Sequence, residues 1–127
     1  MKSSEVRVFD DNDLEFIDIL RNLNLSRNVA STLAYLSNVD EATSKDLELG
    51  SQLRQPEVSI AMRELRTFGW LGEREVKKAG KGRPMKVYKL AVPMSEIVEY
   101  LEKQTKEDTH RILENIGKLK MLKFYNK

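Results

Sequence analysis

Apolar residues recur at three- and four-residue intervals in several segments of the chain, and this spacing predicts amphipathic helices. Ser26 is a candidate N-cap for the second of them, and Thr43, with Asp46 three residues later, resembles a capping box before the third. Pro56 suits the first turn of the fourth helix, which we expect to end at Gly69. The predicted helices lie at about 13–23, 26–37, from 43 onwards, 56–69 and 95–122.

Residues 71–77 and 85–90 favour two short strands. The loop between them, KKAGKGRP, has glycines for positive φ angles and a proline that stiffens the return strand. With the third and fourth helices, these segments predict a helix, a turn, a second helix and a basic hairpin. A helix-turn-helix places its second helix in the major groove of DNA, and a positive hairpin beside it meets the phosphate backbone. Duplex DNA is therefore the leading candidate ligand.

The net charge of +2 conceals an uneven distribution of charge along the chain. Residues 1–25 hold six acids and three bases, whereas residues 54–89 hold ten bases and four acids. Within 77–89 there are six bases and no acid. Positive charge gathered in this way is the electrostatic footprint of a surface that faces nucleic acid. A solvated surface loop is the alternative interpretation.

The fourth helix separates its residues into two faces. At about 100° per residue, Val58, Met62 and Leu65 share the side that must pack on the core. On the opposite side the fork of Arg63 suits the two acceptors of guanine, and Ile60 suits a thymine methyl group. A surface ion pair or plain solvation is the alternative for Arg63. The predicted DNA-reading residues are Gln55, Pro56, Ser59, Ile60, Arg63 and Thr67.

The cations of the hairpin predict contacts with phosphates, which position a protein on the duplex without reading its sequence. The loop does not suit a nucleotide phosphate, because no helix N-terminus follows it. The predicted phosphate-binding residues are Lys77, Lys78, Lys81, Arg83 and Lys86.

Residues 26–92 resemble the winged helix-turn-helix domain of MarR-like and TrmB-like transcriptional regulators of archaea and bacteria. The segments that carry the resemblance are LSRNVASTLAYL, ATSKDL, PEVSIAMRELRTFGWL and KGRPMKVYKL, in this order. The resemblance implies sequence-specific DNA binding and dimerisation through the flanking helices. The chain departs from the family pattern at Gln52, where many members carry glycine in the turn, and at Glu48, where a small residue is usual.

The final helix predicts self-association. Its stripe has apolar ends and a polar middle, so an antiparallel or crossed pairing with a second copy would bury the ends while the middle sets the register. The first helix could supply the rest of this interface. The alternative is that the final helix folds back on its own domain. The stripe consists of Val98, Leu101, Thr105, Asp108, Ile112, Ile116, Leu119 and Leu122.

Enzymatic chemistry finds little support in the sequence. There is no cysteine, and the single histidine, His110, has Glu114 four residues later, which does not make a metal site. We therefore expect neither catalytic residues nor a metal or other cofactor. The chain has no apolar run near the length of about 20 residues that spans a bilayer, nor an apolar N-terminal signal. We accordingly expect a cytoplasmic protein with no membrane partner.

The sequence thus predicts an α+β protein with an N-terminal helix at 1–25, a winged helix-turn-helix domain at 26–92 and a C-terminal dimerisation helix at 93–127. We expect a homodimer that binds double-stranded DNA sequence-specifically and regulates transcription. Two alternatives stay open: a non-specific architectural DNA-binding protein, and a protein-interaction module of the transcription machinery. A small-molecule effector also stays open.

Overall fold

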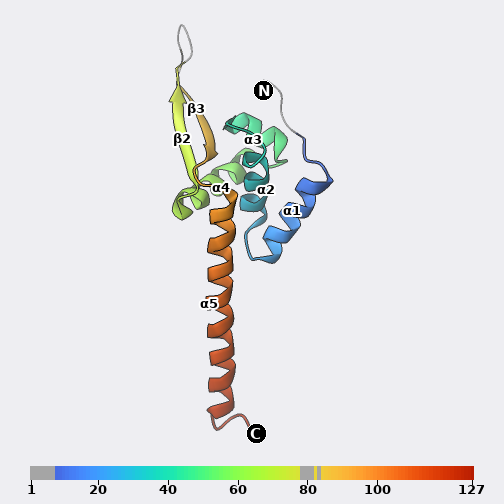
Figure 1. The fold of residues 1–127 in the computed structure, drawn as a ribbon, viewed down its shortest axis with the longest axis vertical. Coiled ribbons are helices and arrows are strands. Elements are labelled where there is room, and N and C mark those ends of the chain that lie inside the picture. Colours follow the sequence, from blue (N-terminus) through green and yellow to red (C-terminus); the bar gives the residue numbers. More distant parts are fainter. Residues whose placement is uncertain (1–7, 78–81, 83) are drawn as a thin grey trace. The chain divides into compact units, whose positions relative to one another are not determined.

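The computed structural model describes residues 8–77, 82 and 84–127, and the chain divides into two compact units, Met1–Pro93 and Met94–Lys127. The second unit contains the helix α5 (Met94–Met121). The predicted helices are confirmed, with ends that shift by at most two residues. The first unit contains, in chain order, α1 (Asp11–Asn22), α2 (Arg27–Leu36), β1 (Ala42–Thr43), α3 (Ser44–Gly50), α4 (Gln55–Phe68), β2 (Leu71–Val76) and β3 (Met85–Leu90) (Figure 1).

Side chains cap the starts of the first three helices, because the first backbone N–H groups of a helix have no partner within it. Ser26 Oγ accepts a hydrogen bond from the amide of Val29 at 3.2 Å. Thr43 Oγ1 accepts from the Asp46 amide at 3.1 Å, and the Asp46 carboxylate accepts from the Thr43 amide at 3.0 Å. Both predicted caps are therefore confirmed. A capping box that the sequence reading missed joins Asp10 and Asp13 at the start of α1.

Helix α2 is the centre of the first unit. Every residue from Val29 to Leu36 is buried, and the helix contacts α1, α3, α4 and β3. A polar link ties its C-terminal end to α1, where the Asn38 amide donates to Asp13 Oδ1 at 2.9 Å and to the Ala34 carbonyl at 2.8 Å. Burial of this helix on all sides sets the positions of the elements around it.

The sheet has three antiparallel strands in the order β1-β3-β2. The hairpin of β2 and β3 was predicted, whereas β1 was missed because two residues are too short to show an alternating pattern. Ala42 pairs with Tyr88 and Thr43 with Val87, so the sheet joins the start of α3 to the hairpin. Trp70 is buried where α4 meets β2, and its ring stacks on that of Phe68 at 4.2 Å.

A bidentate ion pair fastens the hairpin to the loop before β1. Arg74 on β2 donates from Nε and from Nη2 to the two carboxylate oxygens of Glu41, each at 2.7 Å. Hydrogen bonding to Arg74 holds the pKa of Glu41 below its ordinary value of 4.5. The pair therefore stabilises the folded chain in the form in which Glu41 is ionised.

The turn between α3 and α4 contains a residue in the left-handed region, Gln52, with φ of 61°. A positive φ at this position is consistent with the glycine that many of the regulators in the resemblance carry there, because glycine adopts positive φ without steric cost. Helix α4 begins at Gln55, one residue before the predicted start at Pro56, with Arg54 as its N-cap. It ends as predicted at Gly69, whose φ is 81°.

The substitution Gln52→Gly should raise the free energy of unfolding by roughly 0.5–1 kcal/mol, because it removes left-handed strain but adds freedom to the unfolded chain. Denaturant unfolding measures the effect. Gln52→Ala is the matched control, since alanine shortens the side chain without relieving the strain, and it should give no gain. Equal effects of the two substitutions would contradict the assignment of strain to Gln52.

The ion pair predicts a pH dependence of stability. Because the pKa of Glu41 is lowered in the folded chain, its contribution is fully present above pH 4.5 and is lost as the pH falls through the lowered pKa. Glu41→Gln should therefore lower the melting temperature at neutral pH and have a diminishing effect below pH 4.5. Arg74→Gln should behave in the same way. A loss that stays constant down to pH 3 would contradict this role.

Candidate nucleic-acid interface

Helix α4 buries one face and exposes the other. Val58, Ala61, Met62 and Leu65 are buried, as their spacing predicts. The six residues on the other side are all exposed, and even Ile60 has 42% of its surface accessible. We call this exposed set the recognition face: Gln55, Pro56, Ser59, Ile60, Arg63 and Thr67.

Contacts on both flanks of α4 hold the recognition face outward. On one flank, Glu57 lies 3.7 Å from Arg27, and Glu64 accepts a hydrogen bond from Ser26 Oγ at 3.2 Å. Both partners belong to the start of α2. On the other flank, Arg66 pairs with Glu73 of β2 at 3.1 Å. The rotation of α4 about its axis is thus fixed by polar contacts as well as by the buried stripe.

The side chains of the recognition face differ in how free they are to meet a ligand. In the described part of the chain, no carboxylate lies within ion-pair distance of Arg63, so the alternative of a surface ion pair finds no partner there. Gln55 Nε2 donates to Ser59 Oγ at 3.0 Å, and Thr67 Oγ1 donates to the Arg63 carbonyl at 3.0 Å. Gln55 keeps its second Nε2 hydrogen and its Oε1, and Thr67 Oγ1 can still accept, so base contacts by these residues do not require these hydrogen bonds to break.

Arg54 is a candidate DNA contact that the sequence reading missed. It is exposed, it is the N-cap residue of α4, and its backbone amide donates to Glu57 Oε1 at 2.9 Å. The start of a recognition helix carries the residues that contact base edges. A basic residue two positions before the predicted helix start at Pro56 was the available signal.

We call the five predicted phosphate-binding residues of the hairpin the wing, and the structure describes two of them. Lys78, Lys81 and Arg83 lie outside the described residues, whereas Lys77 and Lys86 are exposed. Lys86 stands directly opposite Glu75 in the strand register, so opposite charges are paired across the hairpin at this point. The positive charge of the hairpin strands is therefore smaller than the count of bases along the sequence indicates.

A cavity of about 310 Å³ opens between α1, α2 and the turn before α4. Its lining combines apolar residues, two of them on α1, with two arginines, two serines, one glutamine and one aspartate. Its lining consists of Phe9, Leu14, Ile17, Asp18, Arg21, Arg27, Ser31, Ser51 and Gln52.

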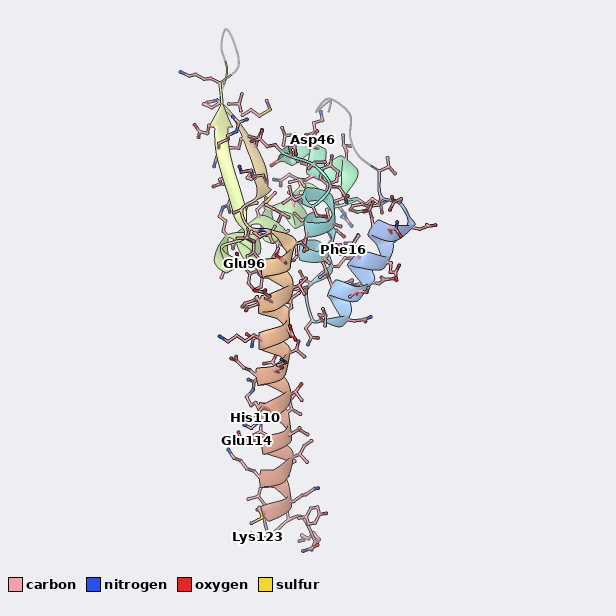
Figure 2. All side chains as sticks on the ribbon, in the orientation of Figure 1. Phe16, Asp46, Glu96, His110, Glu114 and Lys123 are labelled. Atoms are coloured by element: carbon pink, nitrogen blue, oxygen red, sulfur yellow. The ribbon has the colours of Figure 1, made fainter. Side chains whose placement is uncertain are left out.

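The His110 side chain lies 3.6 Å from that of Glu114 on α5, and Figure 2 shows both on this helix. Both are exposed, with 78% and 59% of their side-chain surfaces accessible. Within the described residues, no three His, Cys, Asp or Glu side chains gather where they could hold a metal ion. In the same residues, no helix combines the length and the apolarity that crossing a bilayer requires.

Comparisons with known proteins identify the fold. No model of a protein family and no curated protein matches the chain. Among solved structures, a possible transcriptional regulator from Methanosarcina mazei Go1 is 18% identical over 83% of this chain and 87% of its own, with a TM-score of 0.60. NadR in complex with 4-hydroxyphenylacetate is 19% identical over 89% and 78%, with a TM-score of 0.51. The transcriptional regulator PA4135 is 18% identical over 87% and 80%, with a TM-score of 0.50.

Two of these three structures are named as transcriptional regulators, and none is named as an enzyme. At such low identity the likeness concerns the fold. The narrower resemblance to TrmB-like regulators stays a prediction. The element order, the three-stranded sheet and these likenesses together show that the chain has a winged helix-turn-helix fold, which it shares with solved transcriptional regulators.

Proposed function

We propose that this chain is a transcriptional regulator that binds double-stranded DNA sequence-specifically as a homodimer. The observation that carries the proposal is the recognition face of α4, which is exposed along its length while both flanks are held by contacts to α2 and β2. Arg63 stands in its centre, and a planar guanidinium bonds both acceptors of guanine in the major groove. The fold shared with transcriptional regulators supports the same function.

The proposed division of labour follows from the chemistry of the two surfaces. The recognition face offers side chains that discriminate between bases, with Arg54 beside it at the helix start. The wing offers lysines and one arginine, Arg83, which bind phosphates of any sequence. In a homodimer with two-fold symmetry, the two recognition helices reach half-sites about 10 base pairs apart, or a multiple of that spacing.

Two alternative functions differ from this proposal in what they predict for DNA. An architectural protein would bind all sequences with similar affinity, since phosphates carry most of its contacts. A protein-interaction module would bind DNA weakly even at low salt. Affinity for selected and random DNA at matched salt therefore distinguishes the three.

Arg63→Ala should weaken binding to the preferred sequence about tenfold or more, since a bidentate base contact contributes roughly 1–3 kcal/mol of discrimination. Binding to random DNA should change much less. The preferred sequence is first obtained by selecting bound fragments from a random pool. Fluorescence anisotropy at several salt concentrations then measures both affinities. The fold should persist, because Arg63 is exposed and away from the buried stripe.

Two control variants accompany this experiment. Arg66→Ala removes the same type of side chain from a flank of the same helix, where it pairs with Glu73 and does not face the bases; because the buried stripe and the contacts to α2 still hold α4, its effect on the sequence preference should be much smaller than that of Arg63→Ala. The double substitution of Lys81 and Arg83 by alanine should weaken binding to all sequences alike and lower the salt slope by about one unit per lost contact. If Arg63→Ala instead weakened both kinds of DNA equally, Arg63 would be a phosphate contact and the architectural alternative would be favoured.

We further propose a small carboxylate as an effector, bound in the cavity between α1, α2 and the turn. Arg21 and Arg27 in its mixed lining suit a carboxylate, and Phe9, Leu14 and Ile17 suit an attached apolar group, although Asp18 works against an anion. The solved complex of NadR with 4-hydroxyphenylacetate supports this ligand class. Because Arg27 also pairs with Glu57 of α4, a bound carboxylate would compete for a contact that holds the recognition face.

Calorimetric titration with 4-hydroxyphenylacetate tests the effector proposal. Binding should be measurable, it should weaken in Arg21→Ala and Arg27→Ala, and it should be unchanged in Arg54→Ala, whose guanidinium lies outside the cavity lining. Equal affinity in all these variants would exclude the cavity as the site.

A further inference from the structure

Polar contacts hold the first turn of α4 in place. Arg54 is its N-cap residue, and the Arg54 amide donates to Glu57 Oε1 at 2.9 Å. The other carboxylate oxygen of Glu57 lies 3.7 Å from the Arg27 guanidinium of α2. Pro56 adds stiffness, because its ring fixes φ near about −65°. The backbone that carries Gln55 is therefore fixed by the fold of the chain itself.

Ser59 holds the side chain of Gln55 on the recognition face. Gln55 Nε2 donates one hydrogen to Ser59 Oγ at 3.0 Å, and both residues are exposed. A primary amide carries two N–H donors and one carbonyl acceptor. One Nε2 hydrogen and Oε1 of Gln55 are therefore left for a ligand, and they lie side by side at the end of the same planar group.

Only adenine matches this pair of groups in the major groove. Adenine presents the N7 acceptor beside the N6 donor, so one Nε2 hydrogen and Oε1 satisfy both. Guanine presents two acceptors, N7 and O6, and would leave Oε1 facing an acceptor. Cytosine presents one donor, and thymine presents an acceptor and a methyl group. Each of these three bases would leave a polar group of Gln55 without a partner, which is unfavourable in an interface that excludes water.

We infer that Gln55 reads an adenine in each half-site and that Ser59 is a positioning residue for it. Ser59 engages the Nε2 hydrogen that would otherwise serve guanine, and so directs the amide toward adenine. This inference rests on the proposed sequence-specific DNA binding and names a base that the recognition face requires. The guanine is read by Arg63, two turns further along α4.

The spacing of the two residues along α4 limits the distance between the two bases. Eight residues at about 1.5 Å per residue separate Gln55 from Arg63 by about 12 Å along the helix axis. Successive base pairs are about 3.4 Å apart. We therefore expect the adenine within about four base pairs of the guanine.

The substitution Gln55→Glu tests the adenine assignment. A carboxylate accepts hydrogen bonds but donates none, and its usual base partner is the N4 amino group of cytosine. Fragments selected from a random pool with the full Gln55→Glu chain should carry cytosine where those selected with the unaltered chain carry adenine. The fold should persist, because a negative charge in the first turn of a helix is favourable.

Fluorescence anisotropy on duplexes that differ only at this base pair then measures the preference. The unaltered chain should prefer adenine to cytosine about tenfold or more, and Gln55→Glu should prefer cytosine. Because the two duplexes are compared within one variant, a general loss of affinity from the added negative charge cancels.

Substitutions of Ser59 test its positioning role. Ser59→Ala removes the acceptor for Nε2, so the preference for adenine over guanine should fall by about fivefold or more. Ser59→Thr keeps a hydroxyl and should retain the preference. A residue that only shaped the helix surface would change the affinity for all sequences alike and would leave the base chosen at one position unchanged.

The guanine read by Arg63 is the internal control. Gln55→Glu and Ser59→Ala should leave the preference at that base pair unchanged, because the two side chains contact different base pairs. Arg63→Ala should likewise leave the preference for adenine unchanged.

The possible outcomes separate this inference from the proposed function. If the unaltered chain selected no sequence, sequence-specific binding and this inference would both be overturned. If it selected a sequence whose guanine depends on Arg63, but Gln55→Glu altered no position, only the inference would be overturned. An adenine preference that persists in full in Ser59→Ala would overturn the positioning role of Ser59.

Discussion

The burial of α2 on every side is the constraint on which the first unit depends. Eight consecutive residues of α2, including the polar Ser31 and Thr32, are buried, and α1, α3, α4 and β3 enclose them. Each fully buried leucine, such as Leu33 or Leu36, contributes about 1.5–3 kcal/mol of transfer free energy. Helix α4 packs against α2 with its buried face, so its opposite face points outward. The recognition face is thus a consequence of how the core is packed.

Ion pairs decide which cations of this unit are free for a ligand. Arg66 and Arg74 are engaged by Glu73 and Glu41, and Lys86 stands opposite Glu75. Exposed pairs of this kind contribute little to stability. These pairs have a larger effect on the surface potential, because they neutralise part of its positive charge. Arg54, at the N-cap of α4, and Arg63, within α4, have no acidic partner among the described residues.

The second unit differs from the first in that many of its apolar side chains are exposed. A helix of 28 residues is about 42 Å long, and isolated helices gain most of their stability from tertiary packing of an apolar face. In α5, Ile97 and Leu101 are buried, whereas Ile112, Ile116 and Leu119 are exposed. These exposed residues belong to the stripe for which the sequence predicts self-association, and that pairing stays a proposal.

The sequence by itself determined the helices, their caps and the two faces of α4, because these depend on interactions between residues three or four positions apart. The ends of the hairpin and the stop at Gly69 follow from equally local preferences. Exposure of the six predicted DNA-reading residues could be read from the helical period, whereas their role in binding stays a prediction.

Only the tertiary structure determined the features that depend on residues far apart in the sequence. Strand β1 exists because β3 pairs with it, and two residues carry no periodic signal of their own. The left-handed conformation of Gln52 is imposed by the turn that joins α3 to α4. Which cations are engaged depends on acids 7 and 33 residues away, for Arg66 and Arg74 respectively. Sequence spacing predicts local geometry. Which charged side chains form ion pairs depends on their distance in the folded chain, because Coulomb attraction depends on distance in space.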